Sequence, residues 1–66
     1  MDSKVIGEKL AELRGNRTQA EIAKAIGVST SAISMYENGE RIPNDDIKIR
    51  LSKFYKKSVQ SIFFAN

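Results

Sequence analysis

Residues 18–39, TQAEIAKAIGVSTSAISMYENG, most constrain what this 66-residue chain can fold into. Thr18 carries the hydroxyl of a helix N-cap, and Glu21 three residues later can complete a capping box, which predicts a helix that starts at Gln19. Gly27 ends this helix, because glycine adopts the left-handed conformation of a helix C′ residue without strain. The pattern therefore predicts a short helix followed by a tight turn.

A second short helix is predicted over residues 30–38, with Ser29 as its N-cap and Gly39 at its C′ position. At about 100° per residue, its side chains divide between two faces. The face expected to be buried carries Ile33, Tyr36 and Glu37. The other face is small, mostly polar and uncharged, and carries Ser31, Ser34, Met35 and Asn38. Two short helices joined by a glycine-centred turn make a helix-turn-helix.

The polar face of this second helix has the chemistry needed to enter the major groove of DNA. Hydroxyl groups donate to or accept from base edges, and Met35 or the methyl group of Thr30 can contact a thymine methyl. An ordinary solvent-exposed face of a helical domain is the competing interpretation. The paired caps and the small Ala23, which allows helices to approach closely, favour the helix-turn-helix.

Residues 19–43 resemble the Cro/CI-type, or Xre-type, helix-turn-helix repressors of bacteria, phages and mobile elements. The resemblance is carried by Thr18, Gln19, Glu21, Ile22, Ala23, Ala25, Ile26, Gly27, Val28, Ser29, Ile33, Ser34, Tyr36, Glu37, Asn38, Gly39, Arg41 and Pro43. It implies an all-α, five-helix, lambda-repressor-like domain over residues 1–66, with the helix-turn-helix at its second and third helices. It also implies a transcriptional regulator, more often a repressor, that binds a pseudo-palindromic operator in double-stranded DNA as a homodimer.

The polar face and the resemblance together predict the residues that touch DNA. Predicted base contacts are Ser29, Thr30, Ser31, Ser34 and Met35. Predicted phosphate contacts are Arg17, Thr18, Gln19, Asn38 and Arg41, with Lys24 as an alternative to Arg17. The N-terminus of the first motif helix supports this assignment, because its free backbone N–H groups attract anions.

Glu37 lies beside the expected buried Ile33 and Tyr36, where an unpaired carboxylate would cost several kcal/mol. The family has an arginine near the end of its first helix that pairs with this glutamate. Arg14 matches that arginine if the turn that follows is shorter here than in the family, and Arg17 is the competing partner. The resemblance therefore implies a partly buried salt bridge between Arg14 and Glu37.

A helix before the motif is predicted to begin after Asp2 or Ser3 and to end near Arg14, with apolar residues at helical spacing. Gly7 lies inside it and costs about 1 kcal/mol relative to alanine.

Two helices are predicted after the motif, and no strand is predicted. Asn44, just after Pro43, caps a helix that extends to Tyr55, and Ser58 caps a last turn or two. The predicted core is Ile6, Leu10, Leu13, Ile22, Ala23, Ile26, Val28, Ile33, Ile47, Leu51, Phe54, Val59 and Ile62.

The C-terminal end suggests a second subunit. Phe63 and Phe64 are consecutive and cannot both face the same side of a helix, and so small a domain can hardly bury both. We predict a dimer interface of Tyr55, Ile62, Phe63 and Phe64. A frayed tail with an exposed aromatic side chain is the alternative.

Composition narrows the function classes. The net charge is +3, but residues 1–40 hold five basic and six acidic side chains, so phosphate contacts rest on few residues. The chain has no cysteine or histidine, so neither disulfides nor the usual zinc ligand sets are available, and no cofactor is expected. The only adjacent carboxylates, Asp45 and Asp46, point apart on a helix, which argues against an enzyme. The longest apolar run, residues 62–65, is too short to span a membrane, and we expect a cytoplasmic protein.

Two alternatives to the repressor are considered. An antitoxin-like module would hold a protein partner on its C-terminal apolar patch and use DNA binding for autoregulation. An RNA-binding protein is disfavoured, because the chain lacks exposed aromatic residues interleaved with basic ones for stacking single-stranded bases.

Overall fold

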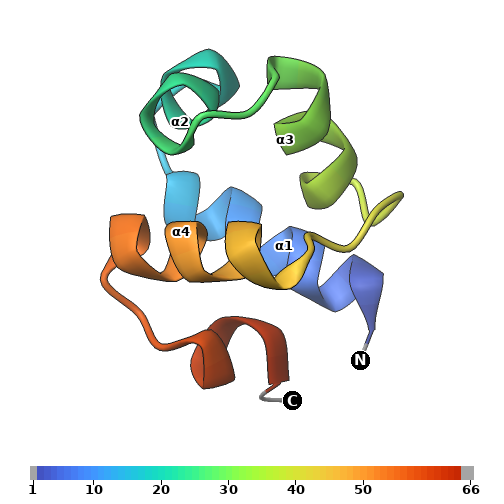
Figure 1. Cartoon of the computed structure of the whole chain (residues 1–66). Helices are drawn as coiled ribbons and strands as arrows, with labels where there is room; N and C mark the ends of the chain where they lie inside the picture. Colours follow the sequence, from blue (N-terminus) through green and yellow to red (C-terminus); the bar gives the residue numbers. More distant parts are fainter. Residues whose placement is uncertain (1, 65–66) are drawn as a thin grey trace.

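The computed structural model describes residues 2–64, which form four α-helices and one short π-helix (Figure 1). In chain order these are α1 (Ser3–Arg14), α2 (Gln19–Ile26), α3 (Thr30–Glu37), α4 (Asp45–Tyr55) and η1 (Gln60–Phe64). In Figure 1, α2 and α3 lie on one side of α1 and α4, and the C-terminal segment lies on the other. The described residues contain no strand, so the predicted all-α, five-helix fold is confirmed. Within residues 2–64, no helix is long and apolar enough to cross a membrane.

Short polar side chains define where the helices begin. Side-chain oxygens of five residues accept a backbone N–H from the first turn that follows them: Asp2, Thr18, Ser29, Asn44 and Ser58. The predicted starts of the helices therefore agree with the structure. The helix predicted over residues 30–38 ends one residue earlier, at Glu37, because Asn38 acts as its C-cap and donates its N–H to Ser34 O at 2.9 Å.

The core is continuous through the described helices and contains Tyr36, which was expected to be buried, and two further aromatic residues that the prediction left out. Its buried side chains are Ile6, Leu10, Ile22, Ala23, Ile26, Ile33, Tyr36, Ile47, Leu51, Tyr55, Ile62 and Phe63. Four residues predicted for the core are only partly buried against it: Leu13, Val28, Phe54 and Val59. A domain of this size has little interior, so these positions lie at the rim of the core.

The backbones of α1 and α3 are in direct contact at Gly7. A Cβ atom on Gly7 would clash with Glu37 O and would lie 2.7 Å from Tyr36 O. Gly39, with φ of 74°, lies just beyond α3 and would place a Cβ atom 2.9 Å from Lys4 Cα. Gly7 is therefore required for packing, whereas the sequence alone indicated only a cost in helix propensity.

The C-terminal segment folds back onto α1 and α4. Phe63 is 2% exposed, whereas Phe64 is 51% exposed. The buried Lys48 of α4 lies over both rings, with its Nζ 5.8 Å from the Phe63 centroid and 5.2 Å from that of Phe64. Tyr55, Ile62 and Phe63, which were assigned to a dimer interface, thus lie inside the protomer's own core, and only Phe64 of that set is exposed.

Candidate nucleic-acid interface

The turn between α2 and α3 has three residues and is closed by backbone hydrogen bonds. Gly27 has φ 78° and ψ 38°, the left-handed conformation expected of it. The N–H groups of Gly27 and Val28 both donate to Ala23 O, at 2.9 and 3.0 Å. Ser29 then returns to extended backbone and caps α3 through its hydroxyl. This short connection determines how α3 is oriented relative to α2.

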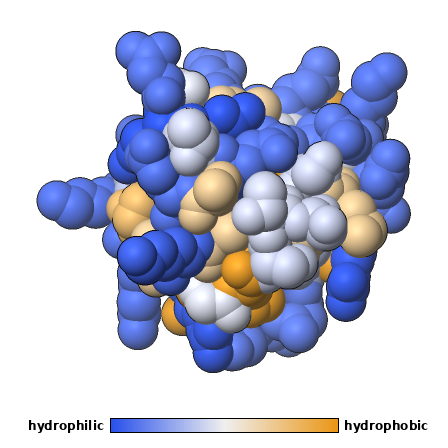
Figure 2. Space-filling model, turned by 90° about the horizontal axis from the view of Figure 1, so that it is seen from above, coloured by the Kyte–Doolittle hydropathy of each residue, from blue (hydrophilic) through white to orange (hydrophobic). Residues whose placement is uncertain are grey.

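The side of α3 turned away from the core carries hydroxyl groups and one thioether, and no charged side chain. We call Thr30, Ser31, Ser34 and Met35 the outer face of α3; helical spacing places them on one side. Thr30, Ser31 and the preceding Ser29 are exposed, while Ser34 and Met35 are half-buried. Figure 2 shows this side of the molecule, where a pale area of intermediate hydropathy over α3 adjoins small apolar areas in tan and orange, with hydrophilic residues around them. All five predicted base-contact residues therefore have some exposed surface.

Glu37 joins α3 to both of the preceding helices. Arg14 Nε donates to Glu37 Oε2 at 2.8 Å, and Arg14 Nη2 donates to Oε1 at 3.0 Å. Gln19 Nε2, at the start of α2, donates to the same Oε1 at 3.0 Å. The Glu37 side chain is only 6% exposed, and that of Arg14 is 24% exposed. The hydrogen bond to Glu37 raises the pKa of Arg14 above its ordinary value, so the guanidinium stays charged.

We call these three side chains, Arg14, Gln19 and Glu37, the Glu37 network. It holds together the end of α1, the start of α2 and the end of α3. A bidentate arginine–carboxylate pair is both strong and directional, so the network resists rotation of α3 about its own axis. We call the side with the start of α2 and the end of α3 the open end of the motif, and the side with the α2–α3 turn the closed end. The network holds the two helices together at the open end, as the backbone turn does at the closed end.

Arg17 does not compete for Glu37. Its Nη2 donates to Leu13 O at 2.8 Å, its Nε donates to Arg14 O at 3.1 Å, and its guanidinium lies 5.2 and 5.4 Å from the ring centroids of Phe54 and Tyr55. Arg17 thus fastens the α1–α2 turn to α4. Arg17 is nevertheless exposed, so its predicted contact with phosphate stays a prediction.

The other predicted phosphate contacts lie at the two ends of the motif. Thr18 and the half-buried Gln19 are at the start of α2, and Gln19 directs one amide N–H inward to Glu37. Asn38 and Arg41 are exposed beyond the end of α3. Asn38 Nδ2 also lies 3.4 Å from Ser34 Oγ, so it borders the outer face of α3.

Arg50 of α4 contacts the motif although sequence patterns did not select it. Its Nη1 donates to Ile26 O, the last carbonyl of α2, at 3.0 Å. No local sequence signal pairs Arg50 with a position 24 residues away. Only the packing of α4 against α2 brings the two together.

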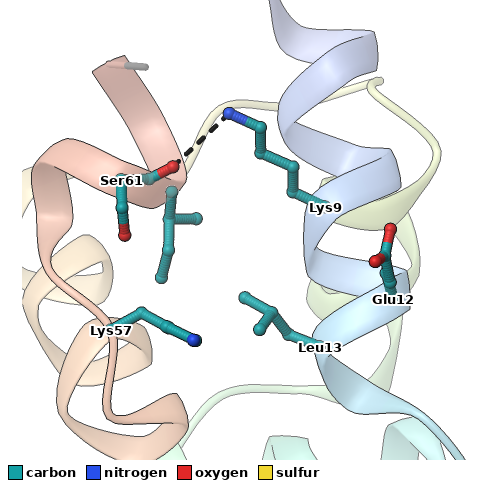
Figure 3. A pocket seen from close by; sticks show the side chains of 6 residues that line it. Lys9, Glu12, Leu13, Lys57 and Ser61 are labelled. Carbon is teal, nitrogen blue, oxygen red and sulfur yellow. Dashed lines mark hydrogen bonds between the residues drawn. The ribbon is translucent and has the colours of Figure 1, made fainter. Parts of the chain in front are cut away.

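The structure also has a small pocket away from α3, between α1 and η1 (Figure 3). Its volume is about 260 Å³, and its lining residues are Lys9, Glu12, Leu13, Lys57, Ser61 and Ile62. Lys9 Nζ donates to Ser61 O at 3.4 Å across one side of it. The pocket lies along the contact between these two elements. Residues 2–64 contain no group of three or more acidic side chains arranged to hold a metal ion.

The fold and the capped turn define a DNA-binding helix-turn-helix protein. The sequence model of a helix-turn-helix family matches residues 8–62, most of the chain. The chain belongs to this family, the Cro/CI-type helix-turn-helix transcription regulators, as residues 19–43 predicted. Comparison with curated proteins and with solved structures gave no match.

Proposed function

We propose that this chain is a repressor that binds a pseudo-palindromic operator as a homodimer, with α3 of each subunit in a major groove. The observation that carries the proposal is the outer face of α3, which is uncharged, rich in hydroxyl groups and held in orientation by the Glu37 network. A face of this kind suits hydrogen bonding to base edges. The proposed base contacts are Ser29, Thr30, Ser31, Ser34 and Met35.

Phosphate contacts are proposed on both sides of the groove. Thr18 and Gln19 lie on one side, and Asn38 and Arg41 lie on the other. A glutamine amide has two N–H donors. Gln19 uses one of them for Glu37, which leaves the second for a phosphate and would make the Glu37 network part of the DNA anchor. Arg17 packs against α4 but is exposed, so it stays a candidate beside Thr18 and Gln19. With so few charged side chains in the set, we expect modest affinity per subunit.

Two half-sites on one operator would offset this modest affinity, because a second binding event on the same duplex benefits from a high effective concentration. The exposed Phe64 supports self-association. It is the most exposed large apolar side chain within residues 2–64. Lys48 packs over its ring and holds it against α4. We propose that Phe64 meets the second subunit.

Selection of bound duplexes from a random DNA pool tests the DNA-binding part of the proposal. We expect enrichment of an inverted repeat whose half-sites are about one helical turn apart. Ser31→Ala should change the preferred sequence, whereas Lys57→Ala, on the side of η1, should not. Failure to enrich any sequence would contradict sequence-specific binding, and enrichment of a single unrepeated site would contradict the dimer. Placing the selected operator over a promoter then tests repression.

Light scattering at tens of micromolar tests the dimer. Phe64→Ser should shift the protein to monomer, whereas Ile42→Ser, at a similarly exposed apolar residue, should not. A wild-type monomer would contradict the homodimer. If that monomer also co-purified with another protein through Phe64, the antitoxin-like alternative would replace the homodimer.

A further inference from the structure

The last carbonyl of α2 is held from outside the helix-turn-helix. The final four C=O groups of any α-helix have no intrahelical partner, so they need a capping group, a side chain or water. In α2, Ile26 O accepts a hydrogen bond of 3.0 Å from Arg50 Nη1, and this bond is partly buried. The residue that follows Ile26 is Gly27, where the chain turns toward α3.

Arg50 is fixed at two points. Its Nη2 lies 2.9 Å from Asp46 Oδ2, one helical turn earlier on α4, while its Nη1 bonds to Ile26 O. A Cβ atom on Gly27 would lie 3.4 Å from the same Nη1. The guanidinium therefore packs on the backbone of the turn as well as bonding to the residue before it. The guanidinium presents its donors in a rigid planar fork and satisfies both partners in a fixed geometry, whereas an ammonium group is a compact charge without such a fork.

The contacts of Arg50 and the Glu37 network lie at opposite ends of the motif. The network joins the start of α2 to the end of α3, which is the open end. Arg50 fastens the closed end, where α2 passes into the turn, to α4. Only residues 27–29 separate this point from α3, so a displacement of the end of α2 would pass directly to Thr30 and to the outer face of α3.

We propose that Arg50 is a positioning residue for DNA recognition: by holding Ile26 O, it sets the orientation in which α3 meets the base edges. The proposal rests on the proposed function, since it assumes that α3 distinguishes sequences. It assigns Arg50 no contact with DNA. Its effect is on discrimination between sequences, because misplaced hydroxyl groups lose base contacts while phosphate contacts tolerate a small shift.

A direct phosphate contact by Arg50 is the competing explanation. Arg50, Lys24 and Lys53 line one open hollow between α2 and α4, and three cations could attract DNA without any positioning role. The two explanations differ in measurable ways. A lost phosphate contact weakens binding to every duplex and lowers the salt dependence, whereas a positioning defect weakens binding to the preferred duplex alone.

The test compares Arg50→Gln with Lys53→Gln, which removes one charge from the same hollow and from the same helix. Affinities for the selected duplex and for an unrelated duplex are measured over a range of salt concentrations, well below the melting temperature of each variant. We expect Arg50→Gln to lower affinity for the selected duplex about tenfold, the effect of about one hydrogen bond to a base edge that the displaced α3 no longer makes. Affinity for the unrelated duplex should fall no more than in Lys53→Gln.

Equal losses on both duplexes for the two variants, or an unchanged Arg50→Gln, would overturn the proposal. Arg50→Lys provides a second variant if Arg50→Gln does not fold. It keeps the charge but lacks the planar fork that holds Ile26 O and Asp46 in a fixed geometry, so it should lose part of the discrimination, and full retention would count against the proposal.

Backbone amide chemical shifts of residues 27–29 in the free protein separate this inference from the proposed function. Arg50→Gln should move them and Lys53→Gln should not, whether or not DNA is bound. Unmoved shifts would contradict the positioning role itself. If the shifts move but the wild-type protein does not discriminate between duplexes, the proposed function fails and the contact remains purely structural.

Discussion

At the scale of single residues, Glu37 contributes more to the geometry of the motif than any side chain on the outer face of α3. Its carboxylate is almost fully buried and accepts hydrogen bonds from Arg14 and Gln19. A buried carboxylate is tolerated only while it is paired, since an uncompensated buried charge costs several kcal/mol. The residue therefore couples the stability of the domain to the orientation of α3.

Arg14→Ala should lower the free energy of unfolding by about 2–3 kcal/mol, below the full cost of breaking a buried pair because Arg14 is partly exposed. It should also weaken DNA binding, because α3 loses its link to α1. Urea unfolding and a binding titration measure the two effects. Arg41→Ala removes an arginine from an exposed site and should change stability by no more than about 0.5 kcal/mol. Unchanged melting and unchanged binding in Arg14→Ala would contradict the role of the pair.

The environment of Tyr55 leads us to expect that the folded protein loses stability in alkaline solution. Burial, and then the charge of Glu37, raise the pKa of Tyr55 above its ordinary value. The folded state thus holds the phenol proton more tightly than the unfolded chain does. The resulting stabilisation is complete below the ordinary pKa near 10 and is lost as the pH rises from there through the raised pKa. Urea unfolding between about pH 8 and pH 11 should therefore show a steeper decline for wild type than for Tyr55→Phe. Parallel declines would refute this assignment.

At the scale of elements, the contact between α1 and α3 depends on the absence of a side chain at Gly7. Alanine at this position would gain about 1 kcal/mol in helix propensity. Its Cβ atom would, however, meet two backbone carbonyl oxygens of α3, which cannot move aside as a flexible side chain would. The steric effect should exceed the gain in propensity.

Gly7→Ala should therefore destabilise the protein by about 2 kcal/mol or more, the range of an overpacked core. Glu8→Ala, next to it on the exposed side of α1, tests propensity without the clash and should be close to neutral. Thermal unfolding of both variants measures the difference. A gain in stability for Gly7→Ala would show that α1 and α3 can separate at little cost.

Helix starts could be predicted from the sequence because a cap is a local interaction. Thr18, Ser29 and Asn44 each bond to a backbone N–H three residues later, so neighbouring residues contain the whole signal. The end of α4 is less clearly marked, because Lys56, rather than a glycine, adopts the left-handed conformation there with φ of 56°. The π-helical geometry of η1 likewise has no sequence signature of the kind that caps provide.

Contacts between distant elements account for what could not be predicted. Phe63 is buried because η1 folds back on the domain, and Tyr55 is buried because it faces residues of α1, α2 and α3, which the periodicity of neither segment reveals. The contacts of Arg17 with the rings of Phe54 and Tyr55 on α4 are of the same kind, and its predicted contact with phosphate stays a prediction. In the candidate site, the residues of the outer face of α3 could be predicted from helical spacing. The inward hydrogen bond of Gln19 and the contact of Arg50 required the structure.

At the scale of the whole molecule, positive charge and the outer face of α3 lie on different elements. The outer face is uncharged, and the basic residues of α4 are Lys48, Arg50 and Lys53. Lys48 is buried over Phe63 and Phe64, and Arg50 is bonded to Ile26 O, so two of these three cations have structural partners. We therefore expect the DNA affinity of this protein to depend less on salt concentration than its basic net charge alone would suggest.

Arg41→Ala should weaken binding to every duplex by a similar factor and should lower the slope of log affinity against log salt by about 0.9, the value of one phosphate contact. Lys57→Ala carries the same charge change on the side of η1 and should leave the slope unchanged. Fluorescence anisotropy at several salt concentrations measures both variants. A change in sequence preference in Arg41→Ala would instead place this side chain against the bases.

The Glu37 network also bears on the order in which the chain assembles. Arg14 and Glu37 are 23 residues apart, whereas Lys9 and Ser61, which join α1 to the C-terminal segment, are 52 apart. The entropy lost on closing a loop grows with its length, and domains rich in local contacts fold fastest. We therefore expect α1, α2 and α3 to close around Glu37 first and η1 to dock last. In that order, the helix-turn-helix is complete before Phe64 reaches its final place.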